Sequence, residues 1–150
     1  MRGPQSGLSL RRDRNAGLNG VLAVDTSALI AVLLREERAD ACMKLLQDAS
    51  GVAISAATVT EALIVAGGRN IRGEMEAFID GLALHIEPVT AAFARRAAAA
   101  YARWGRGIHP AAFNFGDCFA YALAEYHACP LLFVGNDFGR TDIISALPGT

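Results

Sequence analysis

The sequence has few cysteines, and none of them forms a metal-binding pattern. Only Cys42, Cys118 and Cys129 occur among 150 residues, and no two of them make a C-x-x-C pair. An odd number of widely spaced thiols argues against both a disulfide framework and a zinc knuckle. We therefore expect a protein of the reducing cytoplasm.

Long apolar runs and an excess of basic charge are also missing. No apolar run reaches the roughly 18 residues that span a bilayer, and the basic N-terminus lacks the apolar stretch of a signal peptide. The formal net charge of −1 excludes a strongly basic, histone-like nucleic-acid binder. We expect a soluble cytoplasmic protein with no membrane partner.

The first 20 residues differ in composition from the rest of the chain. They are rich in Gly, Arg, Ser and Asn, and their four arginines and one aspartate give +3, which leaves −4 for the other 130 residues. Without an apolar period, residues 1–20 are predicted to be a disordered arm. The chain is 53% hydrophobic, which is enough for one core, so we expect a single domain over residues 21–150.

Short apolar segments alternate with segments of helical periodicity along this domain. Such alternation predicts an α/β fold, with a parallel sheet, right-handed crossovers and helices on both faces. The glycines at 67 and 68 are predicted to end the third helix. Strands are expected at 21–24, 52–54, 84–86 and 131–134, and helices at 28–35, 38–49, 56–66, 73–82, 91–104, 114–127 and 137–144.

Four acidic residues occur where the predicted strands end or the predicted helices begin. Asp25 follows the first strand and Glu61 lies early in the helix after the second. Asp117 starts the helix before the fourth strand, and Asp137 follows that strand. In an open α/β sheet, functional sites gather beyond the carboxyl ends of the strands. All four acids could therefore reach one edge.

Each of these acids also has a purely structural interpretation. Asp25 is a suitable helix N-cap, and Glu61 stands three residues after Thr58, the spacing of a capping box. Asp117 stands three residues after Asn114 and would favour a helix N-terminus. Taken singly, the structural interpretation is as good as the functional one, but the combination favours a site.

Several carboxylates at one edge would repel one another or take up protons unless a cation were bound. Because no His or Cys stands at ligand spacing, the donors in prospect are oxygens, which favour Mg²⁺ or Mn²⁺ over Zn²⁺. Such ions commonly act on phosphates, where they activate water for attack. Phosphodiester hydrolysis is the chemistry that this set predicts.

Three motifs in this order resemble the VapC family of PIN-domain toxins. They are VDTSAL at 24–29, TE at 60–61 and NFGDC at 114–118. The closing stretch PLLFVGNDF at 130–138, with TDI at 141–143, is similar to one branch of that family. The resemblance covers residues 21–147.

The resemblance implies a PIN-like three-layer fold with a mostly parallel sheet of four to five strands. It also implies a Mg²⁺-dependent endoribonuclease that hydrolyses RNA with metal-activated water. Such a chain would be the toxin of a VapBC-type toxin-antitoxin system, forming a homodimer and binding a VapB-like antitoxin. Asp25, Glu61 and Asp117 would bind the metal directly or through water, with Thr26 or Ser27 supporting a ligand.

The sequence departs from the family pattern at the fourth acid and at the N-terminus. The expected acid would stand at Gly135, so Asp137 and Asp142 remain alternative ligands, and either could instead be an ordinary solvent-facing acid. Family members begin close to the first strand. This difference predicts that residues 1–20 are a cloning remnant or the result of a misassigned start codon.

Cations and aromatics before Asp117 have a composition suited to phosphate contact and base stacking. The alternative for each is an ordinary solvated helix face or, for the tryptophan, packing at a helix end. The candidates for RNA binding are Arg95, Arg96, Tyr101, Arg103, Trp104, Arg106 and His109.

Other functions remain open at this point. A haloacid-dehalogenase-type phosphatase needs a second Asp where this chain has Ser27, so that class is a poor match. The remaining alternatives are a non-catalytic PIN-like module that binds nucleic acid or a partner, and a PIN nuclease of RNA processing that has no antitoxin.

Overall fold

The structure is a computed structural model that describes residues 20–149, so the predicted disordered arm lies outside the described residues except for Gly20. The described part alternates strands and helices, as the sequence predicts. The elements are β1 (Val21–Val24), α1 (Thr26–Leu33), α2 (Ala39–Asp48), β2 (Gly51–Ser55), α3 (Ala56–Gly68), α4 (Arg72–Gly81), β3 (His85–Glu87), α5 (Ala91–Trp104), α6 (Phe115–His127) and β4 (Leu131–Leu132).

The four strands form one sheet in the order β3-β2-β1-β4, and every neighbouring pair is parallel. β1 lies in the interior, with Leu22 opposite Val52 in β2 and Val24 opposite Leu132 in β4. Parallel strands need crossover connections, which the helices supply. The predicted α/β class and parallel sheet are confirmed.

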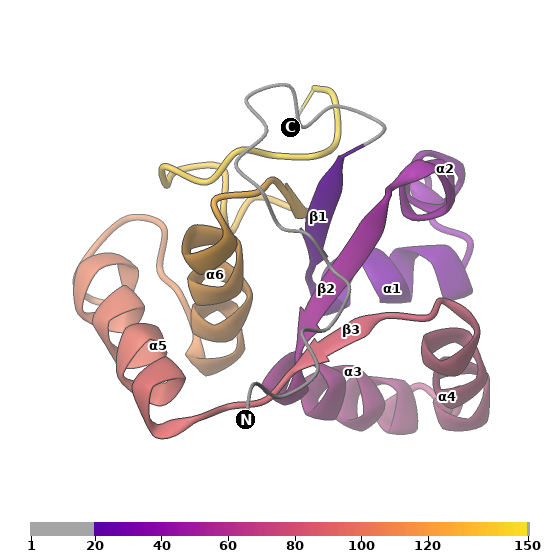
Figure 1. Ribbon diagram of the computed structural model, residues 1–150, viewed down its shortest axis with the longest axis horizontal. Helices are drawn as coiled ribbons and strands as arrows, with labels where there is room; N and C mark the ends of the chain where they lie inside the picture. Colours follow the sequence, from indigo (N-terminus) through magenta and orange to yellow (C-terminus); the bar gives the residue numbers. More distant parts are fainter. Residues whose placement is uncertain (1–19, 150) are drawn as a thin grey trace, which may run out of the picture.

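Helices cover both faces of this sheet and give a three-layer fold. In Figure 1, α5 and α6 lie on one side of the strands and α1 to α4 on the other. Alternate residues of β1 serve the two cores: Ala23 packs with α5 and α6, whereas Leu22 and Val24 pack with α1 to α4. Burial on both faces explains why β1, β2 and β4 read as continuous apolar runs, whereas the edge strand β3 is only partly buried.

Side-chain caps begin three of the helices. Two of these helices follow the carboxyl ends of β1 and β2, and the third contains Asp117 in its first turn. Asp25 caps α1, Ser55 caps α3 and Asn114 caps α6. The predicted glycine stop of α3 is wrong by two residues, because the helix runs through Gly68 and the left-handed position is Asn70, at φ 59°. The Asp25 and Asn114 caps fix the backbone around the candidate site.

The C-terminal segment differs most from the prediction. β4 ends at Leu132 because its neighbour β1 ends at Val24, and the amide of Val134 donates instead to Ser27 Oγ at 3.0 Å. The helix predicted over 137–144 is wrong. The amide of Leu131 donates to the carbonyl of Ile144 at 2.9 Å, so this segment returns to the start of β4 through a series of bends and turns.

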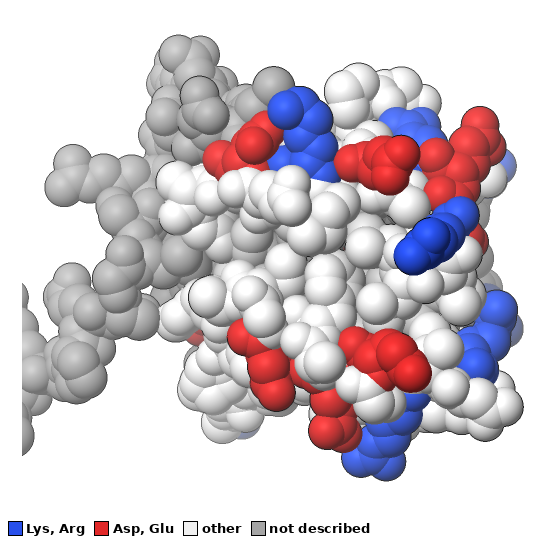
Figure 2. All heavy atoms as spheres, turned by 90° about the vertical axis from the view of Figure 1, so that its right-hand side faces the viewer, with Lys and Arg blue, Asp and Glu red and all other residues white. Residues whose placement is uncertain are grey.

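Within residues 20–149, no helix combines the length and apolar character needed to cross a membrane. The face that presents α2 and α4 carries acidic and basic side chains around an uncharged middle strip (Figure 2). Neither sign forms a continuous field there, so this face gives no sign of a basic surface for nucleic acid.

Candidate functional site

Acidic side chains gather around one depression at the carboxyl edge of the sheet. The depression measures about 330 Å³ and is lined by Asp25, Glu61, Asp117 and Asp137. All four of the acids proposed from the sequence therefore meet at one place. Its walls come from the end of β1, the starts of α1 and α6, the middle of α3, and the loops after α1 and β4.

Asp25 joins the end of β1 to the start of α1. Its Oδ2 accepts hydrogen bonds from the amide of Ser27 at 3.1 Å and from the hydroxyl of Ser27 at 2.6 Å. Burial raises the pKa of Asp25 to about 6, against the lowering effect of these bonds, and the charge of Glu61 raises it further. The N-cap interpretation is thus confirmed, yet it leaves a buried carboxylate that resists ionisation.

Asp117 has the same double character. It forms a capping box with Asn114, in which its Oδ2 accepts from the Asn114 amide at 3.0 Å and its own amide donates to Asn114 Oδ1 at 2.9 Å. Burial raises the pKa of Asp117 to about 7, and the charges of Asp25, Asp137 and Glu61 add to the rise. A cap alone does not account for acids placed so close together.

Glu61 is held by residues other than the capping-box partner. Thr26 donates its hydroxyl to Glu61 Oε1 at 2.6 Å, whereas α3 is capped by Ser55. The capping-box interpretation of Thr58 and Glu61 is therefore wrong. The other carboxylate oxygen, Oε2, lies where a Cβ on Gly116 would be, so Glu61 packs directly on the first turn of α6.

The fourth acid can be chosen between Asp137 and Asp142 by their surroundings. Asp137 lines the depression, whereas Asp142 accepts a hydrogen bond from the hydroxyl of Tyr121 at 2.7 Å. Asp142 also pairs with Arg103 at 3.4 Å. Asp142 thus already has structural partners, and the geometry favours Asp137.

Glu36 is a functional candidate that the sequence did not single out. It lies between α1 and α2, where its amide donates to the carbonyl of Ala31 at 2.9 Å, and it lines the same depression. The only sequence signal was its place in the short gap between the helices predicted over 28–35 and 38–49. Its position at the site depends on how α1 packs on the sheet, which the sequence alone does not show.

The donor set suits a hard cation that keeps part of its water. Ser27 binds Oδ2 of Asp25, and the amide of Asn114 binds Oδ2 of Asp117, so Oδ1 of each buried aspartate can serve as a ligand to a cation. Across residues 20–149, no three His, Cys, Asp or Glu side chains converge into a ready-made metal cage. Mg²⁺ is usually held by one or two carboxylates together with waters and substrate phosphate, so the residues fit that ion better than a closed Zn²⁺ site.

The candidates for RNA contact lie outside the depression, and some have structural partners. Arg96 pairs with Glu125 at 3.4 Å, and Arg103 lies over Trp104. Trp104 is 7% exposed and belongs to the core, where its ring also meets His109 at 4.7 Å. Burial leaves no face of Trp104 for a base. The exposed candidates Arg95, Tyr101 and Arg106 keep their side chains available.

Fold and site together define a class: a parallel α/β protein with buried carboxylates at the carboxyl edge of its sheet, suited to a divalent cation. The family model described as PIN domain matches residues 22–144. The chain belongs to the PIN-domain family, in its VapC ribonuclease branch.

Two relatives from Mycobacterium tuberculosis illustrate this similarity. Ribonuclease VapC28 is 45% identical over 130 residues, which cover 84% of this chain and 98% of that protein. Ribonuclease VapC36 is 41% identical over 127 residues, covering 81% of this chain and 91% of the relative. The family expected from the three acidic motifs is thereby confirmed.

Solved structures support the fold at lower sequence identity. VapC20 of Mycobacterium tuberculosis, a toxin that cleaves the sarcin-ricin loop, aligns with a TM-score of 0.69 at 17% identity over 85% of this chain and 99% of its own. VapBC2 of Rickettsia felis, bound to a promoter DNA fragment, aligns with a TM-score of 0.62 at 14% identity, over 83% and 96% of the two chains. These likenesses establish the PIN-like three-layer architecture.

Proposed function

We propose that this protein is a Mg²⁺-dependent endoribonuclease and the toxin of a VapBC-type toxin-antitoxin system. The observation that carries the proposal is the meeting of four acids at one depression, two of them buried with raised pKa values. Buried carboxylates that repel one another are costly unless a cation neutralises them. The VapC ribonuclease names of its relatives supply the substrate class.

Asp25 and Asp117 would hold the metal, with Glu61 and Asp137 reaching it through water. Each of the two aspartates has one oxygen fixed by a hydrogen bond, Asp25 by Ser27 and Asp117 by the amide of Asn114, so neither carboxylate has to be ordered when the ion binds. Preorganised ligands of this kind raise affinity. Mn²⁺ would satisfy the same oxygen donors.

When bound, such a cation supplies positive charge to the phosphate oxygens and acidifies the attacking water. The chain's own contribution is positional. Thr26 fixes Oε1 of Glu61, and the first turn of α6 receives Oε2, so this carboxylate is aimed into the depression and can accept a proton from water held there. The cation requires ionised Asp25 and Asp117, whose pKa values without metal are about 6 and about 7, so protons should compete with metal binding below about pH 7.

A VapC toxin would also bind an antitoxin and form a dimer. Structural neighbours include toxin-antitoxin complexes from Klebsiella pneumoniae and Rickettsia felis, which supports a VapB-like antitoxin as the partner of this chain. A homodimer belongs to the same proposal. Light scattering of the purified protein, and a small reading frame adjacent to the gene whose product co-purifies with it, would test these two points.

Metal removal tests the central activity. Purified protein should cleave a structured RNA in Mg²⁺, lose cleavage in EDTA and regain it when Mg²⁺ is restored. Cleavage that persists in EDTA would contradict a metal-dependent mechanism. No cleavage of any RNA by the folded, metal-loaded protein would instead favour a non-catalytic binding module.

A further inference from the structure

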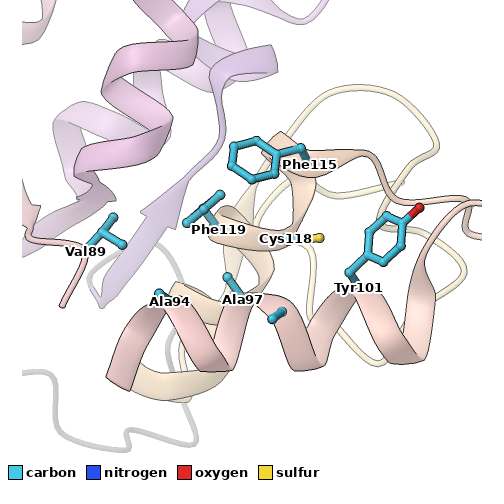
Figure 3. Close-up of a pocket in the computed structure, with 8 residues that line it drawn as sticks. Val89, Ala94, Ala97, Tyr101, Phe115, Cys118 and Phe119 are labelled. Carbon is cyan, nitrogen blue, oxygen red and sulfur yellow. The ribbon is translucent and has the colours of Figure 1, made fainter. Parts of the chain in front are cut away.

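Two hollows flank the first turn of α6, and they differ in chemistry. Figure 3 shows the hollow between α5 and α6, which measures about 550 Å³ and has Phe115 and Phe119 but no charged residue in its described lining. The other is the acidic depression, whose wall includes Val134 and Asp137. Both of these residues belong to the loop after β4, so the place of one acid depends on the path of residues 134–137, which we call the corner loop.

The corner loop is fastened at its start by Ser27. The amide of Val134 donates to Ser27 Oγ at 3.0 Å, two residues after β4 has ended. The same hydroxyl donates its own proton to Asp25 Oδ2 at 2.6 Å. One side-chain oxygen therefore connects the beginning of the corner loop to a buried carboxylate of the depression.

The corner loop is also fastened just beyond its end. Phe138 is 2% exposed, and its ring meets those of Phe113 and Phe133 with centroids 5.3 and 5.1 Å apart. The residues between the two anchors, 135–137, are all exposed. The chain must therefore turn within this short stretch to pass from the Ser27 hydroxyl back to the core.

Gly135 has the backbone conformation that this turn uses. Its φ is +106°, in a region that L side chains rarely adopt. A Cβ at this position would meet nothing within 4 Å. Glycine is therefore required at 135 by the conformation of the chain and not by lack of space.

We propose that Ser27 and Gly135 are positioning residues that set the path of the corner loop and so place the carboxylate of Asp137 beside Asp25, where both serve one cation. The proposal rests on the metal-dependent function proposed above. A carboxylate held by an anchored loop loses less conformational freedom when the ion binds. The proposal also explains why the fourth acid stands at 137: an aspartate at 135 would have to adopt the positive φ.

The test measures Mg²⁺ affinity by titration calorimetry, a readout that needs no RNA. Wild type is compared with Gly135→Ala, Ser27→Ala and Ser27→Thr, each made also in an Asp137→Asn protein. Gly107→Ala is the matched control, because Gly107 has a φ of +82° and open space around a Cβ but does not line the depression. Melting temperatures in EDTA show which variants are folded.

We expect Ser27→Ala to weaken Mg²⁺ binding by about 10- to 100-fold and Gly135→Ala by about 10-fold, as for other outer partners of metal ligands. Ser27→Thr, which keeps the hydroxyl, and Gly107→Ala should retain the wild-type affinity. In the Asp137→Asn protein, Gly135→Ala should have no further effect, since the carboxylate that it positions is gone. Ser27→Ala should still have a smaller effect there, through its bond to Asp25.

Three results would overturn the positioning role. They are an equal loss from Gly135→Ala with and without the carboxylate of Asp137, wild-type affinity in Ser27→Ala, and recovery of Mg²⁺ affinity when Gly135→Asp is added to Asp137→Asn. The Ser27 variants carry the same comparison if Gly135→Ala does not fold. Wild type that binds Mg²⁺ with the expected order of variants but cleaves no RNA would overturn the ribonuclease function alone, and wild type that binds no Mg²⁺ would overturn both.

Discussion

The carboxylate of Glu61 occupies the space that a side chain at residue 116 would need. A Cβ on Gly116 would stand 2.6 Å from Glu61 Cδ and closer still to Oε2, while Thr26 holds the other oxygen at 2.6 Å. The backbone of Gly116 is ordinary helix, so its glycine is not required by a left-handed conformation. The NFGDC motif at 114–118 therefore needs glycine at its centre because α3 contacts α6 there through Glu61.

Gly116→Ala should displace Glu61 and lower kcat for RNA cleavage by about 10-fold or more, the effect typical of residues that position a metal site. Folding should survive, because alanine favours a helix by about 1 kcal/mol over glycine. Gly73→Ala in α4 is the control, since nothing lies within 4 Å of a Cβ there. Wild-type kcat in Gly116→Ala would show that the contact is not needed.

Thr26→Val removes the hydroxyl that orients Glu61 but keeps the volume of this buried side chain. We expect kcat to fall by about 10-fold, as for other outer partners of metal ligands, and stability to fall by about 1 kcal/mol with the lost bond. Thr60→Val provides the comparison, because the Thr60 hydroxyl bonds only to the carbonyl of Ala56 in its own helix. Equal kcat values for the two variants would contradict the positioning role of Thr26.

Stability without metal should depend on pH through Asp25 and Asp117. Their folded-state pKa values of about 6 and about 7 lie above the ordinary 3.8, so the folded protein binds more protons than the unfolded chain between about pH 4 and 7. The free energy of unfolding therefore falls as pH rises through this window and stays low above it. In EDTA, the melting temperature should be higher at pH 5 than at pH 8, and Mg²⁺ should raise it mainly at pH 8.

Asp117→Asn is the control for this pH dependence. The variant should be more stable than wild type in EDTA at pH 8, and its melting temperature should vary less between pH 5 and 8. The difference between the two proteins isolates Asp117 from other titrating groups, such as His127, whose pKa burial lowers. Identical pH profiles would contradict a raised pKa at Asp117.

Substitution of Asp137 should lower activity, whereas substitution of Asp142 should lower stability. Asp137→Asn should lower cleavage with little change in melting temperature, since Asp137 lines the depression. Asp142→Ala leaves the hydroxyl of buried Tyr121 without its partner and should cost about 1 to 3 kcal/mol of unfolding free energy. Denaturant titration and single-turnover cleavage of both variants measure the two effects. The reverse pattern would make Asp142 the fourth acid.

The order of strands and helices could be predicted because the apolar pattern of each element lies within its own short stretch of sequence. β1 and β2 are buried on both faces and read as short apolar runs, and α5 begins and ends where its caps and periodicity place it. The segment 137–144 could not be predicted in this way. Phe138 is buried against Phe113 and Phe133, and Ile144 bonds to Leu131, so long-range packing overrides its local preference for helix.

The candidate site was predictable as a set of acids but not as an arrangement. Parallel topology alone brings Asp25, Glu61, Asp117 and Asp137 to one edge. The partners that orient them depend on how helices dock: Thr26 reaches Glu61 across 35 residues. Trp104, one of the candidates for RNA contact, is buried instead, which confirms the alternative that it packs at the helix end.

The most direct test of the metal-dependent nuclease is the rate of Mg²⁺-dependent RNA cleavage by Asp117→Asn beside Asp80→Asn. Asp80 is exposed on α4, so the second variant makes the same chemical change away from the depression. The account predicts a loss above about 100-fold for Asp117→Asn, since outer partners of metal ligands alone cost about 10- to 100-fold, and wild-type cleavage for Asp80→Asn. Equal rates for wild type, Asp117→Asn and Asp80→Asn at equal folded stability would contradict it.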